Sequence, residues 1–527
     1  MTLKSPLSSL RAVADIVREH GTNRPEHPAL VQGDTTITWR QLYERAGRVA
    51  NYLSSCGVGN QDRIALLDKN SLEHFEIFFG AGLLNAVTVS VNWRLAAPEV
   101  EYIVNDAEAK VLIVGREFLP VLQAIDGKLP TVTHILVIDG PDDYLDFRSA
   151  VDASDSSDPH VQAGPDDVAF QLYSSGTTGR PKGVMLSNAN FLAGIPLSRD
   201  GYQLDADSVN MVAMPLFHIG GGGWAMCGML HGCTSVIVRE VDPAQLIRVI
   251  ERHRITHAFL VPAVLQFMLQ VPGVEEADYS SLKIFLYGAS PISEDVLKRS
   301  IRMFGCTFLQ AYGSTETTGT IVLLPGSDHD PDGPNKHRLR SCGLPIPGVQ
   351  VRIVDTSTGN DTSTREVGEI WVKGPQVMQG YWHMPDETAK SIVDGGWFRT
   401  GDAGYLDADG YLYIHDRVKD MIVSGGENVY PAEVENALMG HPDIADVAVI
   451  AVPHDRWGET PKAMVVRATG SALTEQEVID YARARLAKYK CPTSVDFIDA
   501  LPRNPSGKIL KKDLRAPFWA GRDRMVN

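Results

Sequence analysis

A segment rich in glycine and hydroxyl side chains, at residues 173–183, is the strongest candidate for chemistry in this chain. It reads YSSGTTGRPKG and follows the apolar residues 168–172, which predict a buried strand. Glycine lets the backbone approach an anion, and the hydroxyl and amide groups of such a loop donate hydrogen bonds. Lys182 adds a compact positive charge suited to phosphate. The segment therefore predicts a phosphate-binding loop, although its spacing is not the GxxxxGK[ST] of a Walker A loop.

Other patterns that could carry chemistry are weaker. Residues 220–225 (GGGGWA) satisfy the GxGxxA of a dinucleotide site, but Pro215 and His218 interrupt the strand-to-turn junction that such a site needs. No GxSxG elbow is present, so an α/β-hydrolase would lack its nucleophile. His329 and His337 lie among aspartates at 327–340 and could bind a metal, but an exposed, solvated loop is the interpretation we favour there.

The elements that must position the loop alternate between strand and helix. Helices are predicted over 244–254 and 295–304, and buried strands over 256–261 and 281–287, which favours a parallel α/β core. Residues 149–167, rich in Ser, Asp and Pro, predict a surface connection.

The character of the chain changes near Asp416. Pro431 and Gly440 are typical of the two ends of a short helix, and residues 447–452 of a strand. Thr474 and Glu477 form a capping-box pattern before another helix. These signals predict an α+β unit of about a hundred residues.

Composition limits the function classes. Among 527 residues, 44% are hydrophobic and 22% charged, which is ordinary for a soluble globular protein. Lys and Arg number 49 against 65 Asp and Glu, giving a net charge of −16, so we expect no nucleic acid partner. The six cysteines include no CxxC pair and predict free thiols in a reducing compartment. Without a signal peptide or a membrane-spanning segment in the pattern, a cytoplasmic protein with no integral membrane contact is expected.

Four further motifs follow the loop in order: AYGSTE at 311–316, WFRTGD at 397–402, DRVKDMIVSGGE at 416–427 and PRNPSGK at 502–508. Together the five motifs resemble those of the adenylate-forming superfamily, which contains acyl-CoA synthetases, luciferases and adenylation domains. Within this superfamily the chain resembles the bacterial fatty-acyl-CoA ligases. The resemblance runs from Trp39 to Lys508. It implies an α/β fold with a large N-terminal domain of layered α/β subdomains at 1–416. A small mobile α+β domain at 417–527 would rotate about a hinge near Lys419.

The resemblance also implies a role for each motif. The phosphate loop would hold the β- and γ-phosphates of ATP, and Glu316 would ligate Mg²⁺. Asp402 would accept hydrogen bonds from the ribose hydroxyls, and Tyr312 would lie against adenine. The implied nucleotide- and CoA-contacting residues are Ser174, Ser175, Gly176, Thr177, Thr178, Gly179, Lys182, Gly288, Ala289, Tyr312, Gly313, Asp402, Arg417, Lys419, Gly425 and Gly426.

The implied catalytic residues are Lys508, His218, Glu316 and Thr315. Lys508 would bridge the substrate carboxylate and the nucleotide, because bringing two negative groups together requires a cation. Thr315 would contact the α-phosphate, and His218 would gate the tunnel through which the thiol reaches the acyl carbonyl.

The reaction implied is an ATP-dependent acyl-CoA ligation. A carboxylic acid would become an acyl-AMP with release of pyrophosphate, and the acyl group would pass to CoA. The glycines at 220–223 leave room, and no charged residue is evident at 217–230, so we expect a medium- or long-chain fatty acid or a bulky alicyclic or steroid side-chain acid. Tyr489 and Lys490 are candidates for the CoA nucleotide, beside Cys491.

Alternatives remain open at this point. A fatty-acyl-AMP ligase would load a separate carrier protein instead of CoA, and a non-catalytic relative would only bind. Luciferase-like oxidation is compatible with the same motifs. The partners expected are the acid, ATP and CoA, and a homodimer is compatible with the resemblance.

Overall fold

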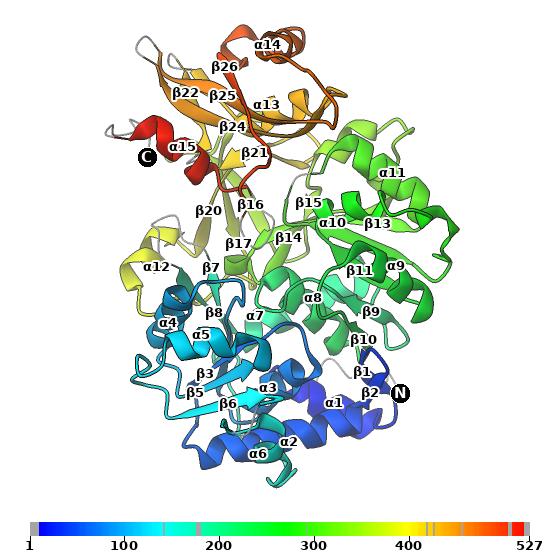
Figure 1. The fold of residues 1–527 in the computed structure, drawn as a ribbon, viewed down its shortest axis with the longest axis vertical. Coiled ribbons are helices and arrows are strands. Elements are labelled where there is room, and N and C mark those ends of the chain that lie inside the picture. The colour runs from blue at the N-terminus through cyan, green and yellow to red at the C-terminus, as the bar shows by residue number, and fades with distance from the viewer. Residues whose placement is uncertain are drawn as a thin grey trace.

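The structure is a computed structural model that describes residues 10–140, 143–174, 181–290, 292–417, 420–424, 427–454, 457–503 and 509–520. Within these ranges the chain forms four β-sheets with helices packed against them. Figure 1 shows the C-terminal sheet and its helices, orange to red, at one end of the molecule, above the rest of the chain.

A seven-stranded sheet holds the predicted phosphate loop, because the loop joins two of its strands. Its order is β18 (Gly380–Tyr381), β8 (Lys182–Ser187), β7 (Val168–Ser174), β4 (Val87–Ser90), β3 (Arg63–Leu67), β5 (Val111–Gly115) and β6 (His134–Ile138). The strands from β7 to β6 pair in parallel, whereas β8 and β18 are antiparallel to their neighbours.

A nine-stranded sheet carries the AYGSTE motif at the end of β13. Its order is β15 (Leu344–Pro345), β14 (Gly319–Leu324), β13 (Thr307–Ser314), β12 (Ile284–Gly288), β11 (His257–Leu260), β9 (Val209–Val212), β10 (Thr234–Ile237), β1 (Pro28–Gln32) and β2 (Thr35–Thr38). The strands from β13 to β1 pair in parallel. The predicted parallel α/β core is confirmed.

Two smaller sheets complete the molecule. One contains β16 (Gln350–Val354), β17 (Gly368–Lys373), β20 (Trp397–Leu406) and β19 (Ile392–Val393), with β21 (Leu412–Arg417) on β20. The other contains β23 (Glu427–Val429), β22 (Ile422–Ser424), β25 (Gly458–Arg467) and β24 (Ile444–His454), with β26 (Ser494–Phe497) on β25.

The helices cover these sheets. They are α1 (Asp15–Asn23), α2 (Trp39–Ser55), α3 (Leu72–Leu83), α4 (Ala97–Asp106), α5 (Leu119–Ala124), α6 (Phe147–Asp152), α7 (Asn188–Leu192), α8 (Ile219–Leu230), α9 (Pro243–Arg252), α10 (Pro262–Met268), α11 (Glu294–Phe304), α12 (Pro385–Ser391), α13 (Pro431–Leu438), α14 (Glu475–Arg483) and α15 (Lys511–Trp519). The predicted capping box is present. The Thr474 side chain accepts a hydrogen bond from the Glu477 backbone N–H, and the Glu477 carboxylate accepts one from the Thr474 backbone N–H. None of these helices, nor any other in the described ranges, is both long and apolar enough to cross a membrane.

The hydrophobic cores follow the two-part division expected from the sequence. The largest buried cluster extends along the chain to Leu412, and a separate one begins at Ile422 and lies between the C-terminal sheet and its helices. Because few apolar contacts join separate cores, each part has its own source of stability. The two-part α/β architecture is confirmed, while the boundary between 416 and 417 stays a prediction. All six cysteines are free, as predicted.

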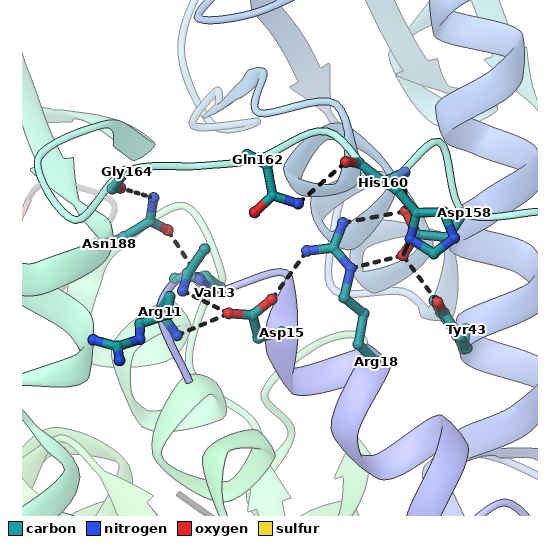
Figure 2. A network of polar contacts seen from close by, with 11 residues as sticks. Arg11, Val13, Asp15, Arg18, Tyr43, Asp158, His160, Gln162, Gly164 and Asn188 are labelled. Atoms are coloured by element: carbon teal, nitrogen blue, oxygen red, sulfur yellow. Dashed lines mark hydrogen bonds and ion pairs between the residues drawn. The ribbon is translucent and has the colours of Figure 1, made fainter. Parts of the chain in front are cut away.

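The connection at 149–167 lies at the surface, as predicted, because every residue in it except Val151 is partly or fully exposed. One of its side chains turns inward. The first residues of the connection belong to α6, and the Asp158 side chain is only 3% exposed because Arg18 of α1 binds it at 2.6 Å. Tyr43 of α2 donates to the same carboxylate at 2.9 Å (Figure 2). Burial acts to raise the pKa of Asp158, but the hydrogen bonds from Arg18 and from the His160 backbone hold it below its ordinary value. The segment therefore fastens α1 to α2.

The loop at 327–340 differs in part from the prediction of solvated residues. His329 is buried, and its ring lies 3.1 Å from the Tyr287 hydroxyl and 3.0 Å from the Pro325 carbonyl. Burial lowers its pKa to about 4, so this histidine is a neutral core residue. His337 is exposed as expected. A sequence pattern of polar residues could not reveal that one of them turns inward.

Candidate functional site

The two ends of the predicted phosphate loop lie opposite each other in one β-ladder. Ser174 closes β7 and pairs with Lys182, which opens β8. Both ends are tied to α4, because Tyr173 donates a hydrogen bond to the Asp106 carboxylate at 2.6 Å and Tyr102 donates to the Pro181 carbonyl at 3.3 Å. The loop residues between, including Ser175, Gly176, Thr177, Thr178 and Gly179, lie outside the described residues.

Lys182 is the cation at the base of this loop. Its side chain is 8% exposed, and its Nζ lies 2.6 Å from the Oε2 atom of Glu387 in α12. The same Nζ lies 4.9 Å from the ring centroid of Tyr381 in β18, a cation–π contact. A buried ammonium needs such partners, because it has lost most of its water.

Glu316 connects three segments of the chain. Its Oε1 atom accepts hydrogen bonds from the Ser174 hydroxyl at 3.1 Å and from the Tyr381 hydroxyl at 3.3 Å. The predicted magnesium ligand therefore lies beside the phosphate loop, as the resemblance implies. In the described part of the chain, no three His, Cys, Asp or Glu side chains form a metal-binding group. One carboxylate fits Mg²⁺ nonetheless, since this ion keeps several waters and takes its other ligands from substrate phosphates.

Tyr312 and Asp402, from two different motifs, are in direct contact. The Tyr312 hydroxyl, on β13, donates a hydrogen bond of 2.7 Å to Oδ2 of Asp402, on β20. Desolvation and the nearby Asp402 charge raise the pKa of Tyr312 well above its ordinary value, so the phenol stays protonated. Arg417 pairs with Asp402 across the β20–β21 ladder, which places two predicted ribose residues in register.

The predicted adenine residues occupy adjacent strand ends. Gly288 ends β12 and pairs with Ala311, where an added Cβ would approach the Ala311 carbonyl to 2.2 Å. At Gly313 a Cβ would lie 1.8 Å from the Gly319 carbonyl, so glycine is required by the close strand pairing at both positions. Ala289 adopts a left-handed φ of 66° directly after β12 and is exposed. Tyr312 follows Ala311 on β13, so these residues are neighbours.

Thr315 lies in a tight turn that follows β13. The turn is fixed by its neighbours, because Thr317 accepts a hydrogen bond from the Ser314 backbone at 2.9 Å and donates to the Gly319 carbonyl at 2.8 Å. Thr318 takes a left-handed φ of 51° and donates to the Gln376 carbonyl at 2.7 Å. The turn that contains Thr315 and Glu316 is in contact with β8, the strand that Lys182 opens.

His218 precedes the first turn of α8 and contacts Phe217, with ring centroids 4.5 Å apart. The helix start lies near the Thr315 turn, because a Cβ at Gly319 would be 3.8 Å from the Ile219 side chain.

The glycines at 220–223 do not support the inferred roomy pocket. A Cβ at Gly221 would meet the Pro215 carbonyl at 2.1 Å, and the space beside Gly220 is filled by the Phe259 ring at 3.1 Å. These glycines allow close helix packing instead.

Several predicted C-terminal residues lie outside the described residues: Lys419, Gly425, Gly426 and Lys508. Of the candidates for the CoA nucleotide, Tyr489 is 42% exposed, whereas Lys490 binds both carboxylate oxygens of Glu433 at 2.7 and 2.8 Å. Cys491 is buried.

Sequence reasoning missed three residues that complete the site: Tyr381, Glu387 and Asp106. Tyr381 stands between Lys182 and Glu316, and Glu387 neutralises Lys182. Asp106 accepts a hydrogen bond from Tyr173, and its other carboxylate oxygen lies 3.3 Å from the Tyr102 hydroxyl. Only GYW at 380–382, a short aromatic motif after a turn, carries a sequence signal, and it is weak.

Fold and site together define a nucleotide-binding α/β protein with a hydroxyl- and lysine-bearing loop beside a carboxylate. Comparison with family models gives the same class. Residues 17–382 match the AMP-binding enzyme family, and residues 433–508 match the AMP-binding enzyme C-terminal domain. The chain therefore belongs to the AMP-binding enzyme family, a family of adenylate-forming ligases, as the motif resemblance indicated.

Individual relatives are similar over nearly the whole chain. A fatty acid–[acyl-carrier-protein] ligase from Streptomyces coeruleorubidus is 39% identical over 98% of this chain and 98% of its own. A long-chain-fatty-acid–CoA ligase from Mycobacterium tuberculosis is 36% identical over 97% of this chain and 99% of its own. Among solved structures, ATP-bound MatB from Rhodopseudomonas palustris superposes with a TM-score of 0.88 at 31% identity, covering 96% of this chain and 99% of that one.

Proposed function

We propose that the protein is an AMP-forming acyl-CoA ligase. A carboxylate oxygen of the acid would attack the α-phosphorus of ATP, the bond to the β-phosphate oxygen would break, and pyrophosphate would leave. A thiolate of CoA would then displace AMP from the acyl-adenylate. The observation that supports this most is the meeting of two motifs that lie far apart in the sequence. Glu316 accepts a hydrogen bond from Ser174 of the loop motif, and Tyr381 contacts both Glu316 and Lys182.

The chain's own residues have distinct tasks in this proposal. Lys182 and the hydroxyls of the loop would bind the β- and γ-phosphates, where negative charge grows as pyrophosphate leaves. Asp402 would accept the ribose hydroxyls, and Tyr312 would lie against adenine. Glu316 would hold Mg²⁺, which neutralises phosphate charge when bound. Lys508 would orient the acid against the nucleotide, as the motif resemblance implies, and His218 would border the thiol path.

The acid we propose is apolar. No Asp, Glu, Lys or Arg occurs in the residues 217–230 that contain α8, so this segment offers no partner for the ammonium of an amino acid. Two of the similar relatives are named as fatty-acid ligases, which supports a medium- or long-chain fatty acid. The panel of acids to be tested should also include bulky alicyclic acids.

A second acceptor has specific support. The relative from Streptomyces coeruleorubidus is named as a ligase of fatty acids to an acyl carrier protein, at 39% identity.

Purified protein with ATP, Mg²⁺ and a panel of acids should show acid-dependent exchange between pyrophosphate and ATP. Mass spectrometry after adding CoA or a phosphopantetheinyl carrier protein identifies the acceptor. If acyl-AMP accumulates in the presence of CoA and is consumed only when the carrier protein is added, the CoA assignment is wrong. If no acid supports pyrophosphate–ATP exchange, the ligase assignment is wrong.

The assignment of Lys508 has its own test. Lys508→Ala should lose nearly all acyl-AMP formation, because the acid and the nucleotide repel each other without a bridging cation. Thioester formation from supplied acyl-AMP should persist, since the adenylate is already made. Equal loss of both half-reactions would contradict the role.

A further inference from the structure

Lys182 is held by a carboxylate that belongs to none of the five motifs. Glu387 lies 205 positions further along the chain, and its Oε2 atom is 2.6 Å from Nζ of Lys182. The two side chains are 8% and 28% exposed, so the pair is shielded on the lysine side and open on the glutamate side. A shielded ammonium needs an anion, because its water has been removed.

Glu387 has a second cation on its other oxygen. Oε1 lies 2.8 Å from Nζ of Lys390, whose side chain is 71% exposed. Each carboxylate oxygen therefore binds a different lysine. If an anion took Lys182 away, Glu387 would keep Lys390 and its contact with water, so releasing Lys182 leaves no buried unpaired charge.

We propose that Glu387 is an exchangeable counter-ion that holds Lys182 until a polyphosphate displaces it, and so sets the affinity of the site for pyrophosphate and for the β- and γ-phosphates of ATP. The inference rests on the proposed function in treating Lys182 as a phosphate ligand. A phosphate group carries more negative charge than a carboxylate, so it displaces Glu387 from Lys182. Breaking the Lys182–Glu387 ion pair costs free energy, and this cost makes phosphate binding weaker than it would be without Glu387.

The alternative, that Glu387 only anchors α12, is weakened by other contacts of that helix. Thr388 accepts a hydrogen bond from the Tyr381 backbone at 2.9 Å and donates to the Met384 carbonyl at 3.0 Å. The first bond fastens α12 to β18, and the second supports the N-terminal turn of the helix, both without the Glu387 carboxylate. Glu387→Gln therefore removes the charge and leaves the helix in place.

The test compares full-length wild type, Glu387→Gln and Asp386→Asn by isothermal titration with inorganic pyrophosphate and with AMP at low ionic strength. Asp386 is the matched control, an exposed carboxylate one residue earlier in the same turn. Glu387→Gln should bind pyrophosphate roughly three- to tenfold more tightly than wild type. Its AMP affinity should change less than about twofold, because AMP lacks the two outer phosphates, and Asp386→Asn should match wild type with both probes.

Equal or weaker pyrophosphate binding by folded Glu387→Gln would overturn the proposal, as would a wild type that binds no pyrophosphate. Glu387→Ala should give the same gain and serves if the glutamine variant fails to fold. In a Lys182→Ala background the gain should vanish. Pyrophosphate–ATP exchange separates the two hypotheses. If wild type shows pyrophosphate–ATP exchange but Glu387→Gln does not bind pyrophosphate more tightly, only the counter-ion proposal is wrong. If Glu387→Gln binds pyrophosphate more tightly but no acid supports exchange, only the ligase proposal is wrong.

Discussion

The two ends of the candidate nucleotide site are prepared in opposite ways. At the phosphate end a cation, Lys182, is already neutralised by the Glu387 carboxylate. At the end that we propose for the ribose, a carboxylate, Asp402, accepts a hydrogen bond from the uncharged phenol of Tyr312. A ligand therefore exchanges charge for charge at one end and hydroxyl for hydroxyl at the other. The difference teaches that ionic strength and counter-ions should control phosphate binding and leave nucleoside binding almost untouched.

The largest effect should come from removing the cation. Lys182→Ala should weaken pyrophosphate binding and lower kcat/KM for ATP by roughly a hundredfold, because the shielded site then presents only the Glu387 carboxylate to an anion. Adenosine binding should stay within about twofold of wild type. Lys390→Ala, which removes the exposed lysine from the same carboxylate, is the control and should act weakly. Equal damage to adenosine binding would show that the two ends are not separable.

Loss of the Asp402 carboxylate should have the opposite effect, weakening nucleoside binding and sparing pyrophosphate binding. Asp402→Asn should weaken adenosine and AMP by roughly ten- to a hundredfold, since hydrogen bonds to a charged acceptor are worth about 1.5–3 kcal/mol. Pyrophosphate binding should be unchanged. Tyr312→Phe keeps the ring and removes only the phenol, so its adenosine affinity should stay within about threefold of wild type. Titration calorimetry with the separate ligands measures both variants, and a pyrophosphate defect in Asp402→Asn would contradict the comparison.

Added salt should distinguish the two ends in the wild-type protein. Raising potassium chloride from low to high concentration should weaken pyrophosphate binding several-fold, on the order of the screening expected for a partly exposed ion pair. Adenosine should lose less than about twofold over the same range. Parallel losses for both ligands would mean that the ribose end also binds through net charge.

The smallest effect concerns stability against pH. The hydrogen bonds from Lys182 and then Lys390 lower the pKa of Glu387 from 4.5 to about 2 in the folded protein. A lowered folded-state pKa gives stabilisation that is present above the unfolded value of 4.5 and is lost as the pH falls toward 2. Urea unfolding should show Glu387→Gln less stable than wild type by about 1 kcal/mol or less at neutral pH, because the pair is partly screened by solvent. That difference should be constant from neutral pH down to about 4.5 and shrink below it. A difference that grows with acid would contradict the ion pair.

Much of the fold was predictable from local patterns. The helices at 244–254 and 295–304 were predicted from apolar spacing, and the structure has them as α9 and α11. The apolar runs at 168–172 and 281–287 predict two strands, and the structure has them as β7 and β12. The surface position of the 149–167 connection was predictable from its polar composition. The contact of its Asp158 side chain with Arg18 was not, because the two residues lie 140 positions apart.

The candidate site divides in the same way. Its motif residues, from Ser174 and Lys182 to Tyr312, Glu316 and Asp402, were predictable because each belongs to a short string with a characteristic order. Tyr381 and Glu387 were not, because their roles depend on β18 lying beside β8 and on α12 following it. The expected role of the glycines at 220–223 misled us, since a missing Cβ can serve close packing as well as an open pocket.

The amino-acid sequence by itself determined the family, the two-part α/β class and the groups that we propose bind the nucleotide, because those properties reside in local spacing and residue type. Only the tertiary structure decided which group faces which. The ion pair of Lys182 and Glu387 joins residues 205 positions apart, and the hydrogen bond of Ser174 and Glu316 joins residues 142 positions apart. Neither partner carries a local signal of the other, since such contacts depend on how the sheets and helices pack and not on the order of nearby residues.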